Sequence, residues 1–228
     1  MPGVTMSLVG VDGAGKTTLA LRLVEALPVP ASYLYMGDNP AASSHLLPTT
    51  RLLWWARRRA VWGHGPPPAE AATREHRLVV RAARLVVALG VLAIQVAEEA
   101  HQLARARSAL RKGRVVVLDR YFRFDYRAHA LTDPERPGLV PRLHGAWLAW
   151  AFPPPDLTVC LDAVPAVLFA RKGEGDEASL TRRRQGYLDL APETPGFVVV
   201  DAGRPPLEVE RDVLALVSCR LLSGQLTA

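Results

Sequence analysis

The first residues that could do chemistry lie near the amino terminus, in the stretch GVDGAGKTT. Its spacing fits G-x-x-x-x-G-K-[ST], with Gly10, Gly15, Lys16 and Thr17 at the fixed positions. Glycines let a loop turn tightly and bring backbone N–H groups close to phosphates. Lysine supplies a mobile charge for the β- and γ-phosphates, and a threonine hydroxyl can bind Mg²⁺. The pattern therefore predicts a phosphate-binding loop.

The segments on either side of this loop have the character that the motif requires. Residues 5–9 form a short apolar run that is typical of a buried strand. Residues 17–27 predict a helix, because Leu19, Leu23 and Leu27 fall on one face and Pro28 ends it. Such a helix directs unpaired N–H groups and its positive dipole end at a bound phosphate. A chance match in a glycine-rich loop is the weaker interpretation.

A second chemical feature is VVVLDRY, residues 115–121. An apolar strand that ends in Asp119 places a carboxylate beside the phosphate-binding loop, where it can hold Mg²⁺ through water. Arg120 follows at the end of the strand, and its guanidinium could bind an acceptor phosphate in a fork. This feature is weak alone, but with the loop upstream it indicates one magnesium and phosphate site.

Alternation of strands and helices defines the expected fold. We predict an α/β fold with a doubly wound, five-stranded parallel sheet flanked by helices and with sites at the carboxyl ends of the strands. The chain of 228 residues suits a single domain, residues 1–228. The predicted strands are 5–9, 32–36, 115–119, 157–162 and 197–201.

Composition narrows the classes of function. Apolar residues make up 49% of the chain, which excludes a disordered protein, and the formal net charge is +6. A basic balance suits phosphorylated small molecules, and we expect no nucleic-acid partner because no nucleic-acid fold signature is present. Cys160 and Cys219 do not suggest a disulfide framework, and we expect both to be buried thiols. Without a basic leader segment, we expect a cytoplasmic location.

A long insert, about residues 37–112, separates the second and third strands. Residues 70–112 predict one long helix or two abutting ones. We expect the apolar part, 84–98, to be buried against the sheet. It is shorter than the roughly 20 apolar residues of a membrane span, and the alternative is a surface that meets a membrane or a partner. The Trp- and Arg-rich stretch 52–62 leaves the same choice open, between packing on the domain and peripheral membrane contact.

Taken together, these motifs resemble the thymidylate kinase family of P-loop nucleoside monophosphate kinases. GVDGAGKTT is similar to the family's P-loop, and DRY at 119–121 to its Asp-Arg-[Tyr/His] motif. PDLTVCLDA resembles the strand before the lid, RRRQGYLDLA an Arg-x-Arg-x-x-Tyr-Leu-x-Leu-Ala helix, and VVVDAGRPPLEV the last strand with the loop near the adenine. The resemblance implies a P-loop NTPase fold with a short lid at about 171–186, and a homodimer formed through a helix at 78–97.

The resemblance also implies roles for individual residues. Asp12 and Arg120 would face the acceptor. Residues 182–184 are three consecutive arginines. Because neighbours on a helix are about 100° apart, these three side chains cannot all reach one phosphate. The arginines that do not reach it would be solvated or would pair with nearby acids such as those at 174–177. The implied lid arginines that act on the transferring group are Arg171, Arg182 and Arg184. The implied contacts to ATP and Mg²⁺ are Gly10, Gly13, Ala14, Gly15, Lys16, Thr17, Thr18 and Asp119.

The acceptor side departs from the family pattern. Thymidylate kinases carry an Arg-Glu-Pro-Gly-type loop after the second strand, where this chain has MGDNPAASS, and a Ser and a Tyr-Gln pair after the DRY motif, where it has FRFDYRAHA. This pattern resembles divergent thymidylate-kinase-like proteins found beside bacterial surface-polysaccharide genes. The candidate acceptor contacts are Asp38, Asn39, Arg51, Arg123, Asp125 and Arg127.

The leading hypothesis is therefore transfer of the ATP γ-phosphoryl group to a nucleoside monophosphate, dTMP or a related one. One alternative is a non-nucleotide acceptor such as a sugar phosphate or a lipid-linked glycan. A hypothesis of a different class is a non-catalytic ATP-binding switch, which the presence of Lys16, Thr17, Asp119 and the lid arginines disfavours.

Overall fold

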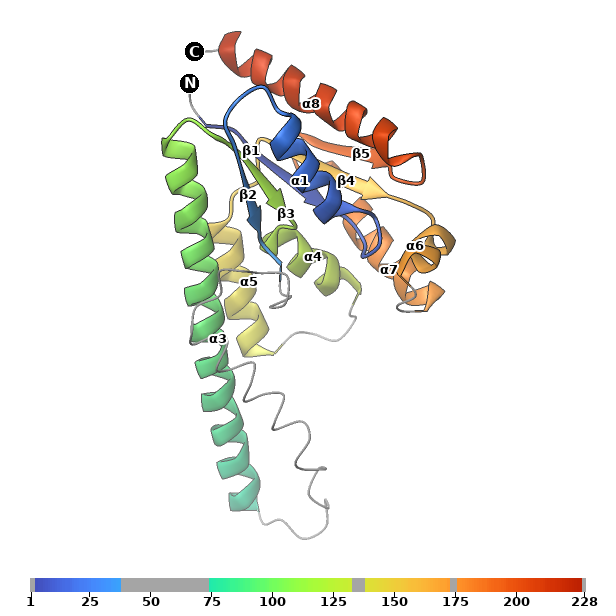
Figure 1. The fold of residues 1–228 in the computed structure, drawn as a ribbon. Coiled ribbons are helices and arrows are strands. Elements are labelled where there is room, and N and C mark those ends of the chain that lie inside the picture. Colours follow the sequence, from blue (N-terminus) through green and yellow to red (C-terminus); the bar gives the residue numbers. More distant parts are fainter. Residues whose placement is uncertain (1–2, 38–73, 133–137, 173–175, 227–228) are drawn as a thin grey trace.

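A five-stranded parallel sheet forms the centre of the computed structural model, which describes residues 3–37, 74–132, 138–172 and 176–226 (Figure 1). The order of the strands is β2-β3-β1-β4-β5, and every neighbouring pair is parallel. The predicted fold class is confirmed. Four strands have the predicted bounds, and β2 is shifted by one residue. The strands are β1 (Thr5–Val9), β2 (Ala31–Tyr35), β3 (Val115–Asp119), β4 (Leu157–Asp162) and β5 (Phe197–Asp201).

Helices cover both faces of this sheet (Figure 1). Helix α1 packs against α8 in one layer. Helix α4 contacts α5 and α7 in the other layer, and α3 belongs to this second layer because it contacts α5. The helices are α1 (Lys16–Ala26), α3 (Arg74–Arg111), α4 (Phe122–Thr132), α5 (Leu139–Ala151), α6 (Pro165–Lys172), α7 (Glu177–Leu188) and α8 (Pro206–Leu226), with a 3₁₀ turn at Ala191–Glu193.

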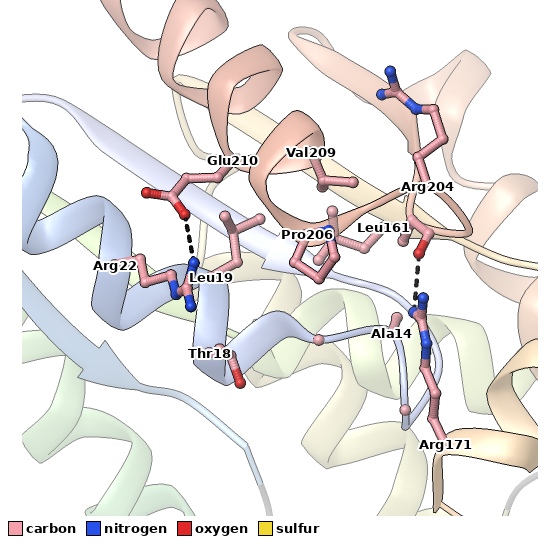
Figure 2. A pocket seen from close by; sticks show the side chains of 13 residues that line it. Ala14, Thr18, Leu19, Arg22, Leu161, Arg171, Arg204, Pro206, Val209 and Glu210 are labelled. Atoms are coloured by element: carbon pink, nitrogen blue, oxygen red, sulfur yellow. Dashed lines mark hydrogen bonds and ion pairs between the residues drawn. The ribbon is translucent and has the colours of Figure 1, made fainter.

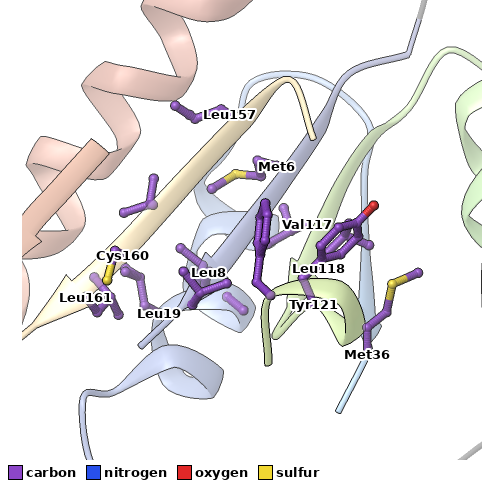
Figure 3. Packing of buried hydrophobic residues seen from close by; sticks show 14 of the residues in the cluster. Met6, Leu8, Leu19, Met36, Val117, Leu118, Tyr121, Leu157, Cys160 and Leu161 are labelled. Carbon is purple, nitrogen blue, oxygen red and sulfur yellow. The ribbon is translucent and has the colours of Figure 1, made fainter. Parts of the chain in front are cut away.

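The core lies along the central strands. Met6, Leu8, Val117 and Val159 are fully buried, and Figure 3 shows how side chains of β1, β3 and β4 gather there with Leu19 of α1. Strands that are covered by helices on both faces need apolar side chains in both directions, which is why these segments read as continuous apolar runs.

The order of the strands places the functional loop. Strand β1 lies between β3 and β4, so the connections after β1 and after β3 leave the sheet side by side. In the β1–β3 register, Leu8 is opposite Asp119, and the next residues after Leu8 lead directly into the glycine-rich loop. In open α/β sheets, ligands bind at such a switch point, beyond the carboxyl ends of the strands.

A single long helix, α3, lies where one long helix or two abutting ones were predicted, but its burial differs from the prediction. It has 38 residues and is about 57 Å long, whereas the five-residue β3 spans about 17 Å. Its amino-terminal half therefore extends past the sheet (Figure 1). Val86 and Val87 are 69% and 66% exposed, so the expected burial of 84–98 is wrong for this face. Residues 38–73 of the insert, which include the stretch 52–62, lie outside the described residues.

The carboxyl-terminal half of α3 is fixed to the domain. The Glu99 carboxylate, only 2% exposed, accepts a hydrogen bond from Trp147 Nε1 at 2.8 Å and lies 2.6 Å from His144 Nε2, both on α5.

By length and composition, Val80–Arg111 is apolar enough to cross a membrane. The prediction that this helix is too short for a membrane span was therefore wrong.

The two cysteines differ in burial. Cys160 of β4 is buried as predicted, and burial raises the pKa of its thiol to about 12. Cys219 is exposed, because it lies on a solvent-facing side of α8, so the prediction of a buried thiol was wrong there.

Candidate active site

The loop after β1 is shaped by its glycines. Gly10, Gly13 and Gly15 have φ of 131°, 91° and 89°, a region that side chains with a Cβ rarely adopt. A β-carbon on Gly10 would also lie 2.4 Å from the carbonyl oxygen of Leu161. Helix α1 starts at Lys16 with no side-chain cap on its first N–H groups. The loop therefore presents uncapped backbone donors, as a phosphate site requires.

Lys16 lies under this loop. Its Nζ donates to the carbonyl oxygens of Gly10 and Val11 at 2.8 and 2.9 Å, and the Asp12 carboxylate is 3.7 Å away. Burial, followed by repulsion from Arg120, lowers the pKa of Lys16 below its usual range. A bound anion would offset both effects, so the ammonium is placed to gain stabilisation when a phosphate arrives.

Asp119 and Thr17 meet at the end of β3. Thr17 Oγ1 donates to Asp119 Oδ2 at 2.6 Å, and the hydroxyl of Tyr33 donates to the same oxygen at 3.0 Å. The second oxygen, Asp119 Oδ1, is buried and has no hydrogen-bond partner among the residues that the structure describes. A buried carboxylate oxygen without a partner costs free energy unless a cation or water binds it. Together with the hydroxyl, this oxygen fits the oxygen ligands that Mg²⁺ prefers.

A charged cluster lies on the opposite side of the loop. Arg120 forms an ion pair with Asp12, and its Nη1 is 4.0 Å from Asp125 Oδ2. Its φ of 71° is unusual for a residue with a side chain and turns the chain sharply from β3 into α4. Tyr187 of α7 donates to Asp125 Oδ1 at 2.9 Å, and burial raises the pKa of Tyr187. The cluster thus joins the loop, α4 and α7.

The three consecutive arginines of α7 point in different directions. Arg184 binds Asp162 in a fork, with Nε–Oδ1 and Nη2–Oδ2 distances of 2.6 and 2.7 Å. Its partner is therefore not one of the acids at 174–177 that we had expected. Arg182 is exposed and makes no hydrogen bond or ion pair with the residues that the structure describes. Arg183 reaches the acceptor side of the loop.

Hollows lie on both sides of the loop among the residues that the structure describes. The larger, about 240 Å³, lies between the loop, α6 and the start of α8 (Figure 2). Arg171 crosses toward it and donates from Nη1 to the carbonyl oxygen of Ala202 at 2.9 Å. The smaller, about 20 Å³, lies on the other side. Thr18 lines the first hollow and Asp12 the second. The loop therefore separates two places where substrate groups can bind.

The predicted acceptor contacts have different outcomes. Asp125 lies in the charged cluster, whereas Arg123 donates to the Phe152 carbonyl oxygen at 3.1 Å and Arg127 pairs with Glu193. The latter two are thus engaged in structural contacts. Asp38, Asn39 and Arg51 lie outside the described residues. Sequence reasoning missed Asp162, Tyr33 and Arg183, although Asp162 could have been found as the acid at the end of a predicted strand.

The β2-β3-β1-β4-β5 order, the glycine-rich loop after β1 and the acid at the end of β3 define the fold of a P-loop kinase. Comparisons with known proteins give the family. The chain is 32% identical over 234 residues to the thymidylate kinase of Deinococcus radiodurans, with 96% of this chain and 98% of that protein covered. It is 27% identical to a probable thymidylate kinase of Methanococcoides burtonii (96% and 98% covered) and 29% identical to the thymidylate kinase of Dinoroseobacter shibae (94% and 96% covered).

The chain belongs to the thymidylate kinase family, and its class is that of a kinase. No protein-family model matches the chain.

Proposed function

We propose that this protein transfers the γ-phosphoryl group of Mg-ATP to a nucleoside monophosphate, with dTMP as the first candidate. The observation that carries the proposal is the pairing of Thr17 with Asp119. The second oxygen of Asp119 is buried beside the uncapped start of α1 and has no hydrogen-bond partner in the described part of the chain. A hydroxyl, a carboxylate and free helix N–H groups at one point are the set that a magnesium–triphosphate complex needs.

The donor nucleoside fits the larger hollow. Its walls combine apolar side chains of α1 and α8, such as Leu19, Pro206 and Val209, with the Arg171 guanidinium (Figure 2). Apolar walls with a few polar groups are typical of nucleobase sites. The triphosphate would then follow the loop toward Lys16, and Mg²⁺, when bound by Thr17 and Asp119, would offset negative charge on the β- and γ-phosphates.

Phosphoryl transfer needs positioning and charge stabilisation rather than a covalent intermediate. Lys16 supplies a buried positive charge at the γ-phosphate. Asp12 and Arg120 lie on the acceptor side of the loop, where Arg120 can bind an acceptor phosphate and Asp12 can orient a hydroxyl. Burial of these groups strengthens their effect on the charge that develops in transfer.

A panel of candidate acceptors identifies the compound that receives the phosphoryl group. Protein, Mg²⁺ and ATP are incubated with dTMP, dUMP, other monophosphates, sugar phosphates and a short polyprenol glycan, and products are identified by mass spectrometry. We expect dTDP as the main product. A phosphorylated sugar or glycan in place of any nucleotide product would support the alternative acceptor class, and ATP binding without transfer to any member would support a non-catalytic switch.

We also propose that the exposed apolar face of α3 pairs with the same face of a second copy. Leu85, Val86 and Leu89 are exposed and lie within about 100° of one another around the helix, and paired helices would bury this face. Light scattering of the purified protein is expected to give the mass of a dimer. A Val86→Glu, Leu89→Glu variant is expected to give the mass of a monomer. A monomeric wild-type protein that floats with liposomes would indicate membrane contact instead. A cytoplasmic location, where ATP is available, is part of the proposal.

A further inference from the structure

Arg183 differs from Lys16, Arg120 and Arg184 because it has no hydrogen bond or ion pair with the residues that the structure describes. Lys16 donates to two carbonyl oxygens, Arg120 pairs with Asp12, and Arg184 is held in a fork by Asp162. Arg183 makes no hydrogen bond or ion pair with any residue in the described ranges. Its side chain is exposed and lines the smaller hollow. A guanidinium that carries five donors is therefore available there to a ligand.

The position of this hollow decides which ligand group it would meet. Gly10 and Val11 line it, and their carbonyl oxygens are the ones that hold the Lys16 ammonium. Arg120 and Tyr187 line its other side. The hollow thus lies between the lysine expected at the γ-phosphate and the arginine expected at the acceptor. The hollow is small, about 20 Å³, which suits a group of a few atoms.

The charges around the smaller hollow also favour a phosphoryl group as its ligand. Asp12 lines the hollow and Asp125 lies beside Arg120, so two carboxylates already offset the positive charge of Arg120. A phosphoryl group in transfer spreads negative charge over its three equatorial oxygens and needs a further cation at that place. Among the described residues that line the hollow, Arg183 can supply this charge without breaking an ion pair, whereas Arg120 is already paired.

We propose that Arg183, rather than Arg182 or Arg184, is the catalytic arginine of α7 and contacts the phosphoryl group in transfer. This inference rests on the proposed function for its phosphoryl donor, but not on the identity of the acceptor. The bond from the γ-phosphorus to the β–γ bridging oxygen breaks, the bond to the acceptor oxygen forms, and Arg183 donates hydrogen bonds to the equatorial oxygens throughout. Arg184 acts as a positioning residue that ties α7 to Asp162 at the end of β4.

The test compares Arg183→Ala with Arg182→Ala, a matched control that removes the neighbouring exposed guanidinium from the same helix. For both variants, kcat and KM are measured with ATP and dTMP, and the slow hydrolysis of ATP with water as acceptor is measured as well. We expect Arg183→Ala to lower both rates about 100-fold or more with little change in the KM for ATP, and Arg182→Ala to stay within about threefold of wild type. Added guanidinium ion at millimolar concentration should restore part of the activity of Arg183→Ala, which a structural role would not allow.

The outcomes separate this inference from the proposed function. If wild type makes no dTDP but Arg183→Ala still loses ATP hydrolysis relative to Arg182→Ala, the dTMP proposal fails and the assignment of Arg183 holds. If both variants have the same rates of transfer and hydrolysis, the assignment is wrong, whatever the acceptor is. An Arg183→Ala variant that raises only the KM for the acceptor would also overturn it, because the arginine would then bind the acceptor and not the group in transfer.

Discussion

Thr17 and Asp119, 102 residues apart in the sequence, share a hydrogen bond of 2.6 Å between Oγ1 and Oδ2. Thr17 lies in the first turn of α1 and Asp119 at the end of β3, so the pair exists because β1 and β3 are neighbours in the sheet. Two oxygen ligands meet at a point that the loop also reaches, which is the geometric basis of the proposed magnesium site.

The hydroxyl of Thr17 gives the first prediction. Thr17→Ala should raise the Mg²⁺ concentration for half-maximal activity about tenfold or more, because one of two protein ligands is lost. Thr17→Ser is the matched variant, since it keeps the hydroxyl and should remain close to wild type. The measurement is the rate of ATP consumption against Mg²⁺ concentration at fixed ATP. Equal magnesium requirements in the two variants would contradict the site.

Lys16 gives a prediction on pH. Its pKa is lowered in the empty protein by burial, and a bound triphosphate should raise it. Between these two pKa values, binding takes up a proton, so the affinity for ATP falls as the pH rises, by up to about tenfold per pH unit. Calorimetry in two buffers of different ionisation enthalpy measures the proton uptake at alkaline pH. Lys112→Met, which removes an exposed lysine, should leave the proton uptake unchanged. Absence of proton uptake in wild type would contradict the placement of Lys16 at the triphosphate.

Gly186 allows α7 to approach α4 closely. A β-carbon there would lie 2.6 Å from the carbonyl oxygen of Ala128, so Gly186→Ala must separate the helices that bring Tyr187 to Asp125. We expect a loss of stability of about 1–3 kcal/mol, together with lower activity. Gly90→Ala is the control, because a β-carbon at that position of α3 would meet no atom within 4 Å among the described residues beyond its own helix turn. It should stabilise the protein by up to about 1 kcal/mol.

Urea unfolding of the two glycine variants provides this comparison. If Gly186→Ala is as stable and as active as wild type, the close contact between α4 and α7 does not position the site.

The buried Glu99 gives a prediction on stability. Glu99→Ala leaves Trp147 Nε1 and His144 without the carboxylate that pairs them, and it opens a space between α3 and α5. We expect a loss of about 2–4 kcal/mol in the free energy of unfolding. Glu25→Ala, at an exposed position of α1, should change stability by less than about 0.5 kcal/mol. Thermal unfolding of Glu99→Ala and Glu25→Ala measures this difference in stability. Equal stabilities of the two variants would show that α3 is held by other contacts.

Local signals were enough to predict the sheet and the donor side of the site. The strands are apolar runs bounded by breakers, and the loop carries its chemistry in consecutive residues, so Lys16 and Thr17 needed no knowledge of distant contacts. Asp119 was found because strand ends converge at one edge of a parallel sheet. These predictions depend on chain geometry that is the same in every fold of this class.

The direction of side chains on α7 could not be predicted in the same way. Helical spacing showed that residues 182–184 diverge, but which of them faces the loop depends on how α7 lies on α4 and β4. That placement is set by Gly186, by the fork between Arg184 and Asp162, and by Tyr187. The exposure of α3 was missed for a related reason, because periodicity gives the length of a helix but not the extent of the sheet beneath it.

The most direct test of the account is the rate of dTDP formation from ATP and dTMP by wild type and by Lys16→Ala, with circular dichroism to verify that the variant is folded. We predict transfer by wild type and a loss of about 1,000-fold or more in the folded variant, because the variant lacks the ammonium that the loop carbonyl oxygens hold. Near-normal transfer by folded Lys16→Ala would contradict the proposed mechanism. No dTDP from wild type, with another acceptor phosphorylated in a Lys16-dependent way, would keep the donor site and replace the acceptor.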